Sequence, residues 1–462
     1  MFFKKLKMRK LFVILLILSY TAITQSANIV YPWHATTAIV KNGDSFEVWL
    51  KADEGQKVTS VSLQALYNAV SVSFKTKNGS WVFDSASENT YNTKITIKVP
   101  ANAPADRYDI VLNTTTGIVT SQAGLKVIKN YKSSYYILHL SDIHAFQNKY
   151  PTTMHRISTI VDIANIINPE MVFNTGDNLY RPNEERMNAL FAGNSESGLK
   201  GFNQFNAATF TVAGNHDIDF DNMPEEGFYK EKAIWWNKWW GLQSFFFSYG
   251  KGRFMGINNG WHGFDPNLQF NTIDNWLKKA GKGNFRLAAA HIRNHKMPTF
   301  DSVANLGLVL LGHNHHIASQ NPSPLNEKPI QYIVNSMRDN MEFNLYKVDG
   351  KTGKYTAVGG PTAQVVYVEN PEDSKTPALY KPKLILTFSN TNNGTFSTNK
   401  ATISNKFNFP IEGTKVRFVM PLGKNYKVSI GKIEQAFDGI NVHIVDVLLD
   451  IEPNSQTEIS IK

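Results

Sequence analysis

Five short polar clusters, each preceded by a hydrophobic run, set the strongest limit on how this chain can fold. The clusters are Asp142-Ile-His144, Gly176-Asp177, Gly214-Asn-His-Asp217, His291 and Gly312-His-Asn-His315. The runs before them read ILHL, MVFN, TFTVA, RLAAA and LVLL, as expected of strands buried on both faces. In layered α/β folds, strand ends at one edge of a sheet meet at a common crevice. We therefore expect the five clusters to surround one point.

The side chains of these clusters are those that bind metal ions. A mixture of His, Asp and Asn suits Mn, Fe, Zn or Co rather than Ca. Two such ions about 3.5–4 Å apart can clamp a phosphate and activate a water between them. The pattern is therefore compatible with two divalent transition-metal ions, which would share a bridging carboxylate.

The order of the clusters resembles the calcineurin-like metallophosphoesterase superfamily, whose pattern is D-x-H, G-D, G-N-H-(D/E), H and G-H-x-H. All five elements occur in order over residues 140–316. The resemblance implies an α/β catalytic domain of two β-sheets packed face to face and flanked by helices. It also implies that phosphate esters are hydrolysed by attack of a metal-bridging hydroxide.

The resemblance assigns a role to each matching residue. It implies that one ion is bound by Asp142, His144 and His315 and the other by Asn215, His291 and His313, with Asp177 bridging them. His216 would protonate the leaving oxygen, and Asp217 would orient the His216 ring. The alternative for Asp217 is that it only stabilises a loop.

The substrate class is less constrained. Members of the superfamily act on phosphomonoesters, nucleotides, cyclic nucleotides and sphingomyelin, and D-x-H with G-N-H-D is common among its phosphodiesterases. We therefore expect a small phosphorylated substrate and slightly favour a diester. The alternatives are a phosphomonoesterase like the purple acid phosphatases and a non-catalytic surface-binding protein. A non-catalytic member should have lost ligands, and none is missing here.

Tyr180 raises the purple acid phosphatase alternative, because Gly176-Asp-Asn-Leu-Tyr180 matches their G-D-x-x-Y element. In those enzymes the tyrosine binds iron and the first motif is D-x-G. Here His144 supplies the ligand that the tyrosine would replace. A phenol with an ordinary pKa of about 10 is also costly to ionise. We expect Tyr180 to pack near the site or to contact the substrate.

Other candidates for substrate contact lie between and after the clusters. Arg293 follows His291, and Trp261 and His262 lie in a predicted loop at the rim of the site. A solvated loop is the alternative for Arg293. The aromatic-rich region from Trp235 to Phe264 is expected to be mostly core.

The flanking segments have a different pattern. Residues 27–130 alternate polar and apolar positions between turn signals, which predicts an all-β sandwich resembling an immunoglobulin or fibronectin module. The α/β pattern covers residues 133–368, and residues 369–382 hold three prolines and predict a linker. Alternation returns in residues 383–462, which predicts a small C-terminal β-domain. Carbohydrate, lipid and protein remain open as ligands of these β-domains.

The first 26 residues have the layout of a secretory signal peptide. Five cations precede the apolar run Leu11–Leu18, and the small residues Thr24 and Ser26 follow. A short membrane anchor is the alternative, but the run is below the roughly 20 residues that span a bilayer. We expect a cleaved leader, a secreted or periplasmic protein, and no transmembrane segment.

Charge and cysteine content exclude several other functions. Without the five cations of the leader, the formal net charge falls from +10 to +5, so nucleic-acid binding is not expected. The chain has no cysteine, which excludes a thiolate nucleophile, cysteine-ligated zinc and disulfide bonds.

Overall fold

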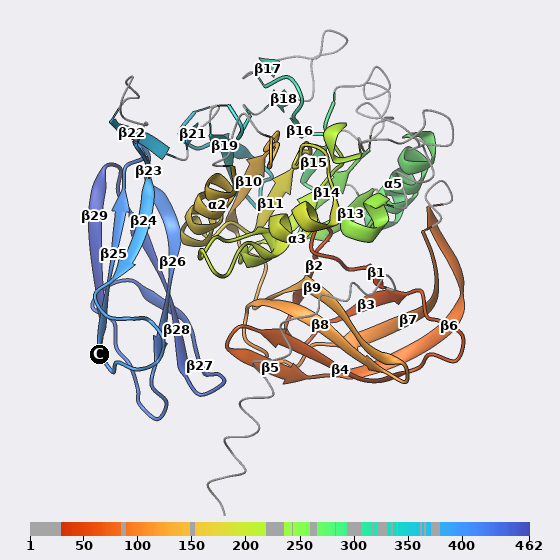
Figure 1. Cartoon of the computed structure of the whole chain (residues 1–462), viewed down its shortest axis with the longest axis horizontal. Helices are drawn as coiled ribbons and strands as arrows, with labels where there is room; N and C mark the ends of the chain where they lie inside the picture. Colours follow the sequence, from red (N-terminus) through yellow and green to blue (C-terminus); the bar gives the residue numbers. More distant parts are fainter. Residues whose placement is uncertain are drawn as a thin grey trace, which may run out of the picture.

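The computed structural model describes residues 29–462 except for 85–88, 148–152, 219–234, 243, 259–265, 282, 293–305, 316–317, 321–329, 334–335, 340, 361–362, 365 and 371–378. The predicted leader lies outside the described residues. Figure 1 shows an N-terminal body of strands, a central body that holds the labelled helices, and a C-terminal body of strands. In the described part of the chain, no helix is long and apolar enough to cross a membrane.

Two β-sheets form the N-terminal body. Their orders are β1-β3-β7-β6 and β2-β9-β8-β4-β5. The strands are β1 (Ile29–Tyr31), β2 (Ala38–Lys41), β3 (Ser45–Leu50), β4 (Val58–Ala65), β5 (Asn68–Ser71), β6 (Ser73–Asp84), β7 (Asn89–Lys98), β8 (Arg107–Thr114) and β9 (Gly117–Ile128). Val48, Ile95 and Ile110 are fully buried in one shared core. The predicted alternation of buried and more exposed positions is present in β3 and β7, whereas β8 and β9 contain runs of consecutive buried residues.

The first sheet of the central body carries three parallel strands beside an antiparallel one, in the order β12-β11-β10-β19-β20. Its strands are β10 (Ser134–Leu140), β11 (Met171–Asn174), β12 (Ala208–Thr211), β19 (Glu342–Asp349) and β20 (Tyr355–Ala357), with β21 (Ala363–Gln364) pairing to β19. Parallel neighbours need long crossovers. The crossovers contain α2 (Thr153–Ile167), α3 (Glu184–Ala192) and the 3-10 helix η2 (Phe202–Gln204).

The second sheet of the central body has the order β13-β14-β15-β16-β18-β17. Its strands are β13 (Phe245–Tyr249), β14 (Gly252–Gly256), β15 (Phe285–Ala289), β16 (Leu308–Leu311), β17 (Ala318–Gln320) and β18 (Ile330–Ile333). Within this sheet, β14 is parallel to β15, β15 to β16, and β16 to β18. Helix α5 (Pro266–Ala280) covers the outer face, where Ile273 packs with Met255 and Val309.

The two central sheets pack face to face. Phe173 of the first sheet and Phe254 of the second belong to one buried cluster with ring centroids 6.2 Å apart. On the outer face of the first sheet, α2 buries an apolar stripe, in which Ile157, Ile160 and Val161 are fully buried. The predicted arrangement of two sheets flanked by helices is therefore present in the central body (Figure 1).

The C-terminal body consists of two three-stranded sheets. These are β24-β25-β29 and β26-β28-β27, built from β24 (Leu384–Phe388), β25 (Asn399–Asn405), β26 (Ile411–Met420), β27 (Lys432–Asp438), β28 (His443–Ile451) and β29 (Ser455–Ile461). Most of its buried hydrophobic residues belong to the core of the central body, while Val419, Val442 and Ile444 form a smaller cluster of their own. Ile411 and Phe418 lie in the same buried cluster as Ile160 of α2. The C-terminal strands are thus the outer covering of that helix (Figure 1).

Part of the segment predicted as a linker, residues 369–382, is in strands. Residues Val366–Asn370 form β22 and Leu379–Pro382 form β23, and these strands pair antiparallel. A proline is tolerated at the end of such an edge strand because no ladder partner needs its missing N–H. Residues 371–378 lie outside the described part of the chain.

The aromatic-rich region is largely core, as expected. The Trp236 and Trp240 rings are fully buried and stack with centroids 5.2 Å apart. Phe191 of α3 meets Trp240 edge-on, and the His34 ring of the N-terminal body stacks on Phe191 at 3.7 Å. Trp235 is only partly buried. These rings join the N-terminal body to the helical face of the central body.

Candidate metal centre

The structure brings all seven predicted metal ligands together at one edge of the paired sheets. They follow the strands β10 (Asp142, His144), β11 (Asp177), β12 (Asn215), β15 (His291) and β16 (His313, His315). Each strand is parallel to a neighbour in its sheet, so the carboxyl ends of all five point the same way within a sheet. The convergence expected from the sequence is therefore observed.

The backbone around these ligands is strained. Five of the seven have a positive φ: Asp142 (53°), His144 (45°), Asp177 (55°), His313 (72°) and His315 (53°). A side chain in this left-handed region costs on the order of 1–3 kcal/mol, and such residues gather at functional sites. The fold thus holds these side chains where ordinary loop geometry would not place them.

Two glycines allow the loops after β11 and β12 to approach each other closely. A Cβ at Gly176 would lie 2.4 Å from the Gly214 nitrogen, and one at Gly214 would lie 2.2 Å from the Asp177 nitrogen. No side chain fits at these distances, and Gly176 also has a φ of 97°. The glycines therefore let Asp177 and Asn215 face the same space.

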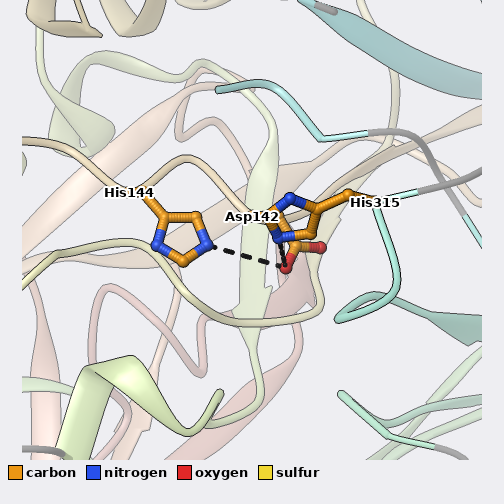
Figure 2. A group of neighbouring side chains, drawn as sticks. All are labelled: Asp142, His144 and His315. Carbon is orange, nitrogen blue, oxygen red and sulfur yellow. Dashed lines mark ion pairs between the residues drawn. The ribbon is translucent and has the colours of Figure 1, made fainter. Parts of the chain in front are cut away.

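One group of ligands surrounds Asp142. Its Oδ1 lies 3.1 Å from Nε2 of His315 and 3.9 Å from Nε2 of His144. Figure 2 marks the ion pairs among these residues with dashed lines. The backbone N–H of His313 donates to Asp142 Oδ2 at 2.9 Å. The same N–H also lies 3.2 Å from Oδ1, so the backbone fixes the carboxylate while Oδ1 faces two imidazole nitrogens.

A second group surrounds Asn215. Its Oδ1 lies 3.1 Å from Nδ1 of His313 and 3.3 Å from Nε2 of His291. The other ring nitrogen of His291 donates to the Thr175 carbonyl at 2.5 Å. That bond places a hydrogen on Nδ1, so Nε2 is the ring nitrogen that would bind a cation.

Asp177 lies between the two groups. Its Oδ2 is 3.6 Å from Nε2 of His144 and 3.3 Å from Nε2 of His291. Its Oδ1 accepts the backbone N–H of His216 at 2.8 Å. A single carboxylate oxygen therefore faces one histidine from each group.

The residues of this centre fit divalent metal ions. The side chain of His144 is 2% exposed, and neither of its ring nitrogens has a hydrogen-bond partner within the described residues. A buried polar nitrogen without a partner is costly unless something else binds it. Because Nε2 faces the carboxylates of Asp142 and Asp177 at 3.9 and 3.6 Å, a cation among these atoms would satisfy it.

The pKa values of His144 and Asp177 also suit metal binding. Burial lowers the pKa of His144 to about 4, so the imidazole is neutral, which is the form that binds metals. Burial works to raise the pKa of Asp177, but the charge of His291 and its hydrogen bond to the carboxylate outweigh it and hold the pKa below its usual range. The carboxylate is therefore ionised at neutral pH.

His216 begins the short 3-10 helix η3 (His216–Ile218), and its ring lies beside the metal ligands. The ring centroid is 4.7 Å from that of His144 and 5.7 Å from that of Tyr180. His216 is partly exposed, so its ring can reach a substrate at the mouth of the site. Tyr180 thus lies at the site, next to the predicted acid.

Asp217 has a different set of contacts from the one predicted. Its carboxylate accepts hydrogen bonds from the backbone N–H groups of Asn178, Leu179 and Gly214, and from the Asn178 side chain. In the described part of the chain, no hydrogen bond joins it to the His216 ring. Burial, and then the charge of Asp177, raises the pKa of Asp217 to about 7. The structure places Asp217 as a clamp between the loops after β11 and β12, which was the alternative expectation.

The other predicted substrate contacts, Arg293, Trp261 and His262, lie outside the described residues. Sequence reasoning also missed three supporting groups. Thr175 accepts from His291, and Asn258 accepts the N–H of Ala213 at 2.8 Å just before the Gly214 loop. The third is the segment 336–339, which contacts Asp142 and His315. The sequence carries a signal for Asn258, because this polar residue directly follows a hydrophobic run.

Comparison with known proteins adds a family assignment. Residues 135–316 match the family model described as calcineurin-like phosphoesterase. Comparison with curated proteins gives no match. The chain is similar to the solved structure of a predicted phosphoesterase from Streptococcus pneumoniae, at 15% identity and a TM-score of 0.21 over 48% of this chain and 98% of the other. A dimetal phosphatase from Danio rerio is similar at 10% identity and a TM-score of 0.30, over 46% and 92% of the two chains.

At TM-scores this low, the two likenesses carry no weight in assigning a function. The family match does, because its span contains the five motifs whose residues converge in the structure. Proteins of this family use divalent metal ions, and the candidate His and Asp groups described above suit such ions. Residues 135–316 are thus a calcineurin-like phosphoesterase domain, which makes this protein a metal-dependent phosphoric ester hydrolase.

Proposed function

We propose that this chain is an exported phosphodiesterase that works with two divalent metal ions. The observation that carries the proposal is the position of Asp177, whose Oδ2 faces Nε2 of His144 at 3.6 Å and Nε2 of His291 at 3.3 Å. A carboxylate oxygen between two histidines from different groups suits a ligand shared by two ions.

The ligand set divides around this shared oxygen. One ion would be held by Asp142, His144 and His315, and the other by Asn215, His291 and His313. When bound, the ions would supply an activated water and neutralise charge on the phosphate. The protein's own residues keep the ligands in place through backbone hydrogen bonds to the carboxylates of Asp142 and Asp177.

His216 is the proposed general acid. Its ring lies beside that of His144 and is partly exposed, so it can hold a proton near the oxygen that leaves the phosphorus. A positioned acid of this kind typically contributes about 10²–10⁴-fold to the rate. Asp217 supports the loop that carries His216 through its bond to Gly214.

A preference for diesters is supported by the sequence pattern. D-x-H at Asp142-Ile-His144 with G-N-H-D at Gly214-Asn-His-Asp217 is typical of the phosphodiesterase branch of the family. The buried position of His144 supports it further, because this residue takes the place of the glycine found in purple acid phosphatases. Export is supported by the leader-like residues 1–26.

The substrate proposal is tested by comparing bis(p-nitrophenyl) phosphate with p-nitrophenyl phosphate. The protein is stripped of metal and then reloaded separately with Mn²⁺, Zn²⁺ or iron. We expect no turnover by the stripped protein and a higher kcat/KM for the diester after reloading. A higher kcat/KM for the monoester would overturn the diester preference. A panel of nucleotides, cyclic nucleotides, phosphosugars and phospholipid headgroups then narrows the substrate class.

Export has its own measurement. When the full chain is produced in a secreting host, we expect the protein outside the cytoplasm to begin at residue 27, as read by N-terminal sequencing. Protein that stays in the cytoplasm with residues 1–26 intact would overturn the export proposal.

A further inference from the structure

A sixth strand end reaches the metal centre. Strand β18 runs parallel to β16, with Ile333 paired to Leu311, so both strands end at the same edge of the sheet. The described residues that follow β18 begin at Ser336, whose hydroxyl donates to the Asp142 carbonyl at 2.8 Å. The N–H of Arg338 donates to the same carbonyl at 3.1 Å. The segment 336–339 is thus fixed to the backbone of a proposed metal ligand.

The segment also places a carboxylate behind a second proposed ligand. Asp339 Oδ2 lies 2.9 Å from Nδ1 of His315, while Nε2 of the same ring lies 3.1 Å from Asp142 Oδ1. The His315 ring is therefore held between two carboxylates. A carboxylate that accepts the Nδ1 hydrogen leaves the lone pair on Nε2, on the side where Asp142 and His144 lie.

Arg338 fixes the direction of that carboxylate. Its Nε donates to Asp339 Oδ1 at 3.0 Å and its Nη2 donates to Oδ2 at 2.8 Å. Its Nη1 reaches Gln147 at 3.2 Å, in the loop that follows His144. Arg338 Nη2 also lies 2.9 Å from His315 Nδ1. Because arginine only donates, the group that can accept a hydrogen from Nδ1 is Asp339.

We propose that Asp339 is a positioning residue for His315. It holds the hydrogen of the imidazole on Nδ1 and fixes the ring, so that Nε2 faces the ion shared with Asp142 and His144, and Arg338 orients the Asp339 carboxylate. The inference rests on the proposed role of His315 as a metal ligand. It gives Arg338 and Asp339, which follow β18 and lie outside the five motifs, a part in metal binding.

The test measures Mn²⁺ binding to the metal-free full chain by isothermal titration calorimetry. We expect Asp339→Asn to weaken one of the two binding steps by about 10–100-fold and to leave the other unchanged, because loss of such a supporting carboxylate typically has this effect on metal affinity. Asp339→Glu keeps a carboxylate and should recover part of the lost affinity. Two unchanged binding steps in a folded Asp339→Asn protein would overturn the proposal.

A matched control uses another Asp–His pair. Asp438 Oδ1 lies 2.6 Å from Nδ1 of His443, and these residues belong to β27 and β28 of the C-terminal body. Asp438→Asn should leave both binding steps unchanged. If it weakened binding as much as Asp339→Asn, the effect would be a general loss of stability and the proposal would fail.

The position of the hydrogen on the His315 ring can also be measured directly, which tests the proposal even if an Asp339 variant does not fold. Nitrogen NMR of labelled histidines in the Zn²⁺-loaded wild type should show a His315 ring with its hydrogen on Nδ1, assigned by loss of the signal in His315→Gln. A hydrogen on Nε2 would overturn the proposal whatever the variants do. Failure of the proposed function would look different, since the wild type itself would then bind fewer than two ions or hydrolyse neither ester.

Discussion

The guanidinium of Arg107 donates a hydrogen bond of 2.6 Å to the hydroxyl of Thr209, and so joins the N-terminal sandwich to β12 of the central body. The same group donates to the carbonyls of Phe205 and Ala207 at 2.9 and 2.7 Å. Strand β12 leads directly to Asn215 in the metal centre. The N-terminal body therefore supports a strand that carries part of the site.

Arg107→Ala should destabilise the whole chain. The change leaves several buried acceptors unpaired, at about 1–3 kcal/mol each, so we expect the free energy of unfolding to fall by roughly 3–5 kcal/mol. Urea denaturation followed by fluorescence measures this. Arg253→Ala is the control, because that guanidinium also binds carbonyls but lies nearer the surface, within the central body. Equal losses for the two variants would contradict a special role for the Arg107 contacts.

Stability at low pH should depend on Asp446. Burial works to raise its pKa, but Lys415 and Arg417 outweigh burial and hold the pKa well below its usual range. Because the folded-state pKa is depressed, the contribution of Asp446 is fully present above its unfolded pKa of about 3.9 and is lost as the pH falls towards the folded-state value. We expect Asp446→Asn to lower stability at pH 7 and to flatten the loss of stability below about pH 5.

Urea denaturation between pH 2 and 7 checks this prediction. Glu458→Gln is the control, since Glu458 forms an exposed ion pair with Lys400 and such pairs contribute little. An Asp446→Asn protein as stable as the wild type at pH 7, with the same acid slope, would show that the expected linkage is absent.

His216→Ala and Asp177→Asn should separate catalysis from metal binding. The first variant should keep two metal equivalents and lose about 10²–10⁴-fold in kcat, most of all for esters with poor leaving groups. The second should lose metal and activity together, because its carboxylate faces histidines of both groups. Metal content by mass spectrometry and turnover of esters with graded leaving groups measure both. Loss of metal in His216→Ala would show that the ring is a ligand rather than an acid.

Asp217→Asn should loosen the metal centre. The amide would present N–H donors where the carboxylate now accepts from Gly214, Asn178 and Leu179. We expect a loss of about 2–4 kcal/mol in unfolding free energy and weaker metal binding, since a buried donor left without an acceptor has a cost. Denaturation and calorimetry with Mn²⁺ measure the two effects. If turnover alone fell, with stability and metal affinity intact, Asp217 would act through His216 as the sequence first predicted.

Tyr180→Phe should not change the metal centre. Tyr180 lies beside His216, and His144 already supplies the nitrogen that a tyrosinate would replace. We expect the iron-loaded variant to keep its metal content and its visible absorption spectrum. A charge-transfer band that is present in the wild type and lost in Tyr180→Phe would instead establish a purple-acid-phosphatase-like site.

The convergence of the metal ligands could be predicted because it depends on local pattern. Asp142, Asp177 and Asn215 each follow a hydrophobic run of strand length, and parallel strand ends share an edge. The face-to-face sheets followed from the family resemblance that these motifs carry.

Features that depend on contacts distant in sequence could not be predicted. The role of Asp339 depends on β18 lying beside β16, and an Arg-Asp pair after a strand carries no signal of its own. The bonds of Asp217 depend on the close approach of two loops that have glycine at the contact. The alternating pattern of the C-terminal strands predicts strands with one buried face, but it does not show what that face packs against. In the structure, Phe418 packs in the same core as α2.

The Asp177 carboxylate contacts both the proposed metal ligands and the backbone of the proposed acid, His216. Oδ1 of Asp177 accepts the backbone N–H of His216, and Oδ2 faces one histidine from each group. If the proposed ions shift this side chain when they bind, the backbone of His216, the proposed acid, should shift with it. Incomplete loading of the ions should therefore also misplace the acid, and the rate should fall by more than the loss of metal charge alone explains.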